Sequence, residues 1–237
     1  TILPRMHCYW GTMSLVNAEI EAFASVLASG RSYTHIHLIS GNDMPIKSNA
    51  EIKEFFGANA GRNFLSIYPH NDRFFTHIRC RYPFPRCFQR KGMAYIPFRL
   101  GRLANTYYHI LEKALFVHKW RYKNVPFKKG SQWASVTPEF ASYLATEGRK
   151  FAKEYSHSLA PDEYFLGTLL YSSPFVDPLV NDNKRYIRWS EAFAEHPDEL
   201  SMADYDAIMS SDAFFARKFN ITTDKPLILR IRQAIKS

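Results

Sequence analysis

Strand and helix patterns alternate near the start of this chain, and that alternation limits the fold more than any other feature. Residues 33–40 form an apolar run typical of a buried strand, and residues 64–68 form a second one. Between them, Ser48 precedes residues 50–56, whose apolar side chains recur at helical spacing. Because strands that alternate with helices form parallel sheets covered by helices, the sequence predicts an α/β fold with a mostly parallel sheet flanked by helices.

The length and the apolar content fit one sizeable core. The chain has 237 residues, of which 46% are hydrophobic, and it contains no internal repeat and no convincing linker. We therefore predict a single domain over residues 1–237. Within it, residues 70–102 lose their periodicity and are rich in proline, arginine and aromatic residues, so we predict a long functional loop or insertion there.

The positive charge of the chain favours anionic partners. Lys and Arg number 31 against 22 Asp and Glu, a formal net charge of +9, which suits nucleic acid, acidic lipid headgroups or a nucleotide diphosphate. No helix-turn-helix, zinc-finger or RNP-like pattern is present, so we expect no nucleic-acid partner. No apolar run reaches the roughly 18–20 residues of a membrane span, and three cysteines cannot all pair. These features predict a cytoplasmic protein and leave open peripheral contact with the acidic inner face of a membrane.

A glycine and an acid follow the first predicted strand. Gly41 and Asp43 lie at its carboxyl end, where ligands bind in open parallel sheets. Gly41 would let a ligand approach the backbone, and Asp43 could accept hydrogen bonds from a ribose or sugar hydroxyl. The alternative is a tight turn in which Asp43 caps its own backbone.

Two acids open a later helix. Asp162 and Glu163 occupy the first turn of a helix that begins at Pro161, where the helix dipole favours an ionised carboxylate. A helical wheel places Asp162 near the centre of the apolar stripe and Glu163 at its edge, which suits a general base beside a cleft. The alternative is that both are ordinary acids at a helix start.

Cations and a second acidic pair complete the candidate residues. Lys218 lies with Arg217 between phenylalanines, and Arg185 belongs to a strand-like alternation, so these side chains could reach a buried phosphate or extend to the surface. Asp204 and Asp206 match the Asp-x-Asp metal motif, but their neighbours predict the first turn of a surface helix. We therefore predict no metal site there.

Six stretches, taken in order, resemble the core-2/I-branching family of β-1,6-N-acetylglucosaminyltransferases, which includes the peptide O-xylosyltransferases. They are residues 9–16, 36–47, 130–133, 160–165, 185–189 and 215–219. The resemblance implies a GT-A-like fold and an enzyme that inverts the anomeric carbon in one displacement, with a UDP-sugar as co-substrate and no metal. The family's first strands have no counterpart here, which predicts a bacterial-type member truncated at its N-terminus.

The resemblance also implies roles for particular residues. Glu163 would be the catalytic base, and Arg185 and Lys218 would bind the donor diphosphate. The remaining candidates would contact the donor or acceptor sugar: Gly41, Asp43, Trp133 and Asp162. N-acetylglucosamine or xylose would pass to a hydroxyl of a glycan or glycoconjugate, as in polysaccharide biosynthesis. The rival interpretation is a catalytically inactive glycan- or nucleotide-binding module.

Overall fold

The computed structural model describes residues 3–69, 72–88, 93–117, 124–177, 179–191 and 196–236. The chain forms two compact units, each assembled from three stretches. The first comprises Thr1–Ser32, Ile67–Gln132 and Pro138–Leu179, and the second comprises Tyr33–Ser66, Trp133–Thr137 and Val180–Ser237. The single domain predicted from the sequence is thus divided into two units. Three of the crossings fall inside strands, so no proline- or glycine-rich linker marks them.

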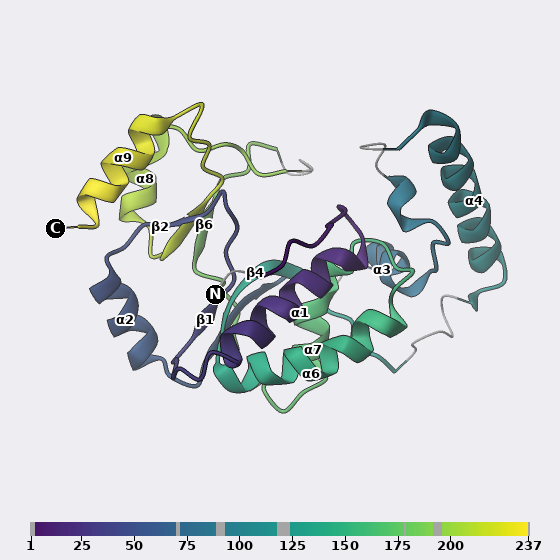
Figure 1. Cartoon of the computed structure of the whole chain (residues 1–237), viewed down its shortest axis with the longest axis horizontal. Helices are drawn as coiled ribbons and strands as arrows, with labels where there is room; N and C mark the ends of the chain where they lie inside the picture. Colours follow the sequence, from purple (N-terminus) through teal and green to yellow (C-terminus); the bar gives the residue numbers. More distant parts are fainter. Residues whose placement is uncertain are drawn as a thin grey trace. The chain divides into compact units, whose positions relative to one another are not determined.

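Three helices form the core of the first unit. α1 (Met13–Leu27), α6 (Pro138–Glu154) and α7 (Asp162–Tyr171) pack against one another (Figure 1). In α7, every residue from position 164 to 170 is buried, as expected for a helix that is apolar on all sides. The apolar stripe of α1 and the inner face of α6 complete this core, through the buried side chains Val16, Ile20, Phe23, Phe140, Leu144 and Phe151.

The segment predicted to be a loop is largely helical. Residues 70–102 contain α3 (Asp72–Arg79), the 3-10 helix η1 (Pro85–Phe88) and the start of α4 (Tyr95–Ala114). Residues 70, 71 and 89–92 lie outside the described ranges. The periodicity was obscured because α4 turns polar and small residues inward, opposite to the usual pattern of a surface helix.

The strands form two sheets. β1 (Ile36–His37), β4 (Gly130–Val136), β3 (Asn63–Ile67) and β5 (Leu179–Val180) follow one another in the larger sheet. β2 (Met44–Pro45), β7 (Phe215–Arg217) and β6 (Arg185–Ile187) form the smaller one. β6 pairs with β7 in parallel, whereas β1–β4 and β2–β7 are antiparallel. The sequence predicts a mostly parallel sheet. Of these three strand pairs, however, only β6–β7 is parallel, and the very short β1 and β2 both pair in the antiparallel direction.

Helices cover the strands of the second unit. Phe56 of α2 (Asn49–Ala58) packs with Phe64 of β3 and Phe215 of β7. The helix α9 (Lys225–Ala234), the short α8 (Tyr205–Ser210) and the 3-10 helix η2 (Met202–Asp204) surround a second apolar cluster that includes Ala216. Ser48 lies directly before the helix predicted from the sequence and caps α2 through a reciprocal capping box with Glu51. The predicted α/β fold with sheets flanked by helices is confirmed.

Within the described ranges, no helix combines the length and the apolar character needed to cross a membrane.

A glycine in α7 sets how closely this helix approaches its neighbours. A Cβ atom at Gly167 would lie 2.8 Å from the carbonyl oxygen of Lys128 and 3.0 Å from the Ile67 side chain. Gly57, in α2, has no atom within 4 Å of the same position. Gly167 is therefore required by packing, whereas Gly57 is not.

We expect Gly167→Ala to lower the free energy of unfolding by about 1–3 kcal/mol, because the backbone of Lys128 must shift. Gly57→Ala, the control, should raise it by up to about 1 kcal/mol through helix propensity alone. Thermal unfolding followed by circular dichroism measures both. A Gly167→Ala midpoint equal to that of the parent chain would contradict the packing argument.

Candidate active site

The start of α7 is fixed by bonds to distant parts of the first unit. The Leu159 amide donates to the His77 carbonyl, and the Ala160 amide donates to the Gly11 carbonyl, each at 2.9 Å. The Ser158 hydroxyl donates to the Ile78 carbonyl at 2.8 Å. These bonds hold the turn before the helix, so the first two helical side chains have defined directions.

Glu163 faces solvent beside a cation. Its Oε2 lies 2.9 Å from Nζ of Lys129, and 38% of its side chain is exposed, against 23% for Lys129. The carboxylate also sits in the first turn of α7, where the helix dipole favours negative charge. Glu163 is thus held as an accessible carboxylate, as a base that receives a proton from a bound hydroxyl must be.

Asp162 points the other way, into the unit. Its Oδ1 is buried and has no hydrogen-bond partner among the described residues. Burial, with a smaller contribution from the negative charge of Glu163, raises the pKa of Asp162 to about 6. Adjacent residues of one helix therefore hold carboxyl groups of different character.

A third acid, Glu19 of α1, interacts electrostatically with Asp162. Its Oε1 accepts a hydrogen bond of 2.9 Å from Nε2 of Gln132, while Oε2 is buried with no partner in the described ranges. Burial raises the pKa of Glu19 well above its ordinary value, and the charge of Asp162 raises it further. The sequence offered one signal for it, an acid within the apolar stripe of α1. It offered none for the pairing of Lys129, which depends on a long-range contact.

In the second unit, Asp43 is bound by the backbone and side chain of the turn that follows β1. The Asp43 carboxylate accepts hydrogen bonds from the Ser40 amide at 2.7 Å and the Ser40 hydroxyl at 2.9 Å. Its side chain is only 1% exposed. These contacts of Asp43 match the alternative interpretation, in which it caps its own turn. Gly41 is exposed, and no protein atom lies within 4 Å of a Cβ built on it.

Asp43, Trp133 and Arg217 are brought together. Nε of Arg217 lies 3.6 Å from Oδ1 of Asp43, and the guanidinium lies over the Trp133 ring, 4.2 Å from its centroid. Lys218 follows directly and is half-buried, and its carbonyl accepts a 2.9 Å bond from the Leu200 amide. Arg217 is thus held beside an aromatic ring, and Lys218 follows it in sequence with its backbone bound to Leu200.

Arg185 lies in the interior of the second unit. Its Nη2 donates to the Ala134 carbonyl at 2.7 Å and to the Leu38 carbonyl at 3.2 Å. Its Nη1 donates to the Ser135 hydroxyl at 2.9 Å and also to the Asn183 carbonyl. Burial lowers the pKa of Arg185 to about 9. These contacts favour a structural cation, and a diphosphate would have to displace protein acceptors to reach the terminal nitrogens.

The Asp-x-Asp pair serves the helix start. The Asp204 carboxylate accepts hydrogen bonds from Arg188 at 2.5 Å, the Ser201 amide at 2.8 Å and the Ser201 hydroxyl at 3.1 Å. Asp206 is exposed in the first turn of α8. The Asp204 carboxylate is thus bound by an arginine and by Ser201, which caps the start of the 3-10 helix. Within the described ranges, no group of three or more His, Cys, Asp or Glu side chains could hold a metal ion.

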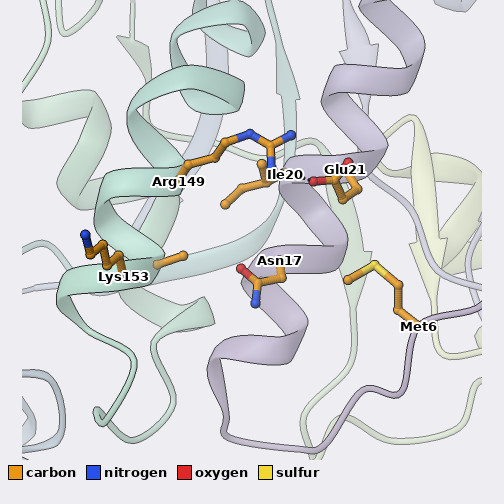
Figure 2. A pocket seen from close by; sticks show the side chains of 7 residues that line it. Met6, Asn17, Ile20, Glu21, Arg149 and Lys153 are labelled. Atoms are coloured by element: carbon orange, nitrogen blue, oxygen red, sulfur yellow. Dashed lines mark ion pairs between the residues drawn. The ribbon is translucent and has the colours of Figure 1, made fainter.

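A pocket of about 420 Å³ lies between α1 and α6 of the first unit. Figure 2 shows Glu21 and Arg149 reaching towards each other across it, and they form an ion pair of 2.8 Å. Met6, Asn17, Ile20, Ala152 and Lys153 complete the lining. None of the residues predicted to act in catalysis or binding lines this pocket.

The chain belongs to the Core-2/I-Branching enzyme family, whose sequence profile matches residues 1–209. It is 25% identical over 253 residues to Xylosyltransferase 2 of Rattus norvegicus and to that of Homo sapiens, with 94% of this chain covered. It is 21% identical over 261 residues to Xylosyltransferase oxt of Drosophila melanogaster, with 97% covered. In each comparison it spans only 26% of the relative. The family resemblance inferred from the six stretches is confirmed.

Asp162 gives the site a pH signature. The native state holds its proton between pH about 4 and about 6, where the unfolded chain has lost it. The contribution of this carboxyl group to stability therefore falls as the pH rises through that window, and it stays low above it.

Asp162→Asn should raise the free energy of unfolding at pH about 8 by roughly 1–3 kcal/mol, since a neutral amide avoids the buried charge. The gain should shrink towards zero near pH 4. Asp206→Asn, an exposed acid in the first turn of α8, is the control and should change little at either pH. Urea unfolding at both pH values measures the difference. A gain that is the same at both would rule out Asp162 as the titrating group.

Proposed function

We propose that this chain is the catalytic part of a glycosyltransferase. It transfers a sugar from a UDP-sugar to an acceptor hydroxyl, with inversion and without a metal ion. Membership of the Core-2/I-Branching enzyme family supports this class of reaction, and the names of the relatives favour xylose over N-acetylglucosamine as the first donor to test. The observation that carries the proposal is Glu163, a half-buried but accessible carboxylate held by Lys129 at the start of α7.

The reaction is a single displacement. Glu163 accepts the proton of the acceptor hydroxyl while the acceptor oxygen bonds to the anomeric carbon. The bond between that carbon and the phosphate oxygen breaks, and its electron pair leaves with UDP. Attack opposite to the leaving group inverts the anomeric carbon, and no enzyme nucleophile is needed.

The leaving diphosphate needs positive charge as it departs. Lys218 and Arg217 supply it in this proposal, because they are adjacent and half-buried, and Arg217 is held beside Trp133. Two adjacent cations provide the stabilisation that a divalent ion provides in other transferases. Arg185 does not contact the diphosphate in this proposal. It positions β6 and, through strand pairing, β7, which carries Arg217 and directly precedes Lys218. The acceptor in this proposal is a glycan or glycoconjugate.

An inactive module that binds UDP or glycans is the second candidate. The interior placement of Arg185 favours it, since one of the two cations expected at the diphosphate donates to protein acceptors instead. Such a module would bind UDP without releasing it from any UDP-sugar.

Glu163→Gln should retain the fold and UDP binding but reduce transfer by about 100-fold or more, because only the proton acceptor is lost. Glu139→Gln, an exposed acid in the first turn of α6, is the matched control and should keep the parent rate. UDP release from UDP-xylose and UDP-N-acetylglucosamine, assayed in excess EDTA, gives the rates. Near-parent turnover of a folded Glu163→Gln would remove this residue from the mechanism. Activity that depends on added Mn²⁺ would contradict the metal-free step.

Lys218→Ala should weaken UDP binding about 10- to 100-fold, which corresponds to about 1.5–3 kcal/mol for charge-assisted hydrogen bonds. Binding of uridine, which has no phosphate, should stay unchanged. Lys225→Ala, at the exposed start of α9, controls for the loss of one positive charge. Calorimetry with both ligands measures the effect. Equal losses for UDP and uridine would mean that Lys218 acts on structure and not on the diphosphate.

A further inference from the structure

The helix α4 is rotated so that its polar side faces the protein. The Asn105 amide bonds both backbone groups of Phe84, accepting from the amide at 2.9 Å and donating to the carbonyl at 2.8 Å. Oε2 of Glu112 accepts from the Arg81 amide at 2.8 Å. Both side chains are buried. Because Asn105 and Glu112 lie two turns apart on one face, these bonds set the rotation of the helix about its axis.

A glycine on the same face confirms this setting. Gly101 is buried against η1, where a Cβ atom would lie 2.2 Å from Sγ of Cys87. No larger residue fits at this closest approach. The inward face of α4 is therefore defined by one glycine and two polar side chains.

The outward face is apolar. Five large side chains, between 60% and 71% exposed, recur at spacings of four and three residues and so form one stripe. We call them the outer stripe of α4: Ile96, Leu100, Leu103, Tyr107 and Ile110. Burying such a stripe is favourable, at about 25 cal/mol per Å² of apolar surface. An exposed apolar stripe of this length marks an interaction surface.

Cations border the outer stripe. Arg99, Arg102 and Lys113 are exposed on the side of the helix next to it. Glu112 is the only acid between residues 95 and 114, and it faces inward. The exposed side of α4 therefore combines apolar and positively charged groups with no negative charge.

We infer that α4 docks this protein on an anionic lipid surface. The helix lies parallel to the membrane, with the outer stripe in the boundary between headgroups and acyl chains. Arg99, Arg102 and Lys113 bind the phosphate groups of the headgroups. A basic amphipathic helix binds in this way through apolar burial plus attraction to anionic lipids. The net charge of +9 adds to the attraction. This docking is separate from the proposed transfer reaction.

Charge favours a membrane over a second copy of the chain. In a twofold contact through the outer stripe, the basic side chains of one copy would face those of the other, and α4 has no outward acid to pair with them. Anionic headgroups neutralise the same side chains.

Vesicle flotation with the 237-residue chain tests the inference. We expect binding to phosphatidylcholine vesicles that contain about a third phosphatidylglycerol, and much weaker binding to phosphatidylcholine alone. Raising the salt from about 0.1 M to 1 M, which shortens the screening length from about 10 Å to 3 Å, should weaken it. Leu103→Glu with Ile110→Glu should reduce binding at least tenfold. Arg99→Ala with Arg102→Ala should reduce it about fivefold per charge.

Matched changes on α9 provide the controls. Leu229→Glu, and Lys225→Ala with Arg232→Ala, alter residues that are also exposed and should leave at least half of the binding. Circular dichroism checks that each variant is folded. Three outcomes would overturn the inference: no flotation of the parent chain, equal flotation of a folded α4 variant and the parent, or dimerisation lost in the outer-stripe variant without any vesicle binding.

Discussion

The second unit depends on the buried guanidinium of Arg185. It joins β6, which carries it, to the carbonyls of Leu38 and Ala134, and so connects the smaller sheet to the larger one. Protein acceptors bind Nη1 and Nη2 of this buried charge, whereas Nε is buried with no hydrogen-bond partner in the described part of the chain. Removal of one partner from a buried charged pair costs about 3–5 kcal/mol. β7 pairs with β6, so the position of Arg217 follows from the position of Arg185. Trp133, which contacts Arg217, lies within β4 of the larger sheet, and Asp43, which also contacts it, directly precedes β2 of the smaller one.

In the first unit, helix geometry gives two neighbouring acids different surroundings. Consecutive helical residues point about 100° apart, so Asp162 can enter the interior while Glu163 reaches solvent and Lys129. Burial raises the pKa of Asp162 to about 6, whereas the Glu163 side chain lies accessible beside Lys129. Two acids of one turn thus have separate surroundings, one buried in the interior and the other accessible and paired with a cation.

Local patterns predicted those parts of the fold that local interactions determine. The helix that follows Ser48, the strand β3 and the start of α7 all follow from short-range chemistry. The Asp204 helix start was predicted for the same reason. The division into two units was not predicted, because the chain crosses between them inside strands. A strand alternation assigns Arg185 to a face but does not show that acceptors from other strands surround that face. Likewise, the ion pair of Lys129 and the inward turn of Asn105 arise from tertiary contacts that leave no periodic signal.

The configuration of the first-formed product distinguishes a single displacement assisted by one base from other routes of transfer. UDP-xylose and UDP-N-acetylglucosamine carry the sugar in the α configuration, and water can replace an unidentified acceptor. Proton NMR during turnover of the donor by the whole chain would show which anomer of the free sugar appears before mutarotation. A single displacement should give the β anomer first. Initial formation of the α anomer would require a different mechanism, and UDP binding without any sugar release would identify the inactive module instead.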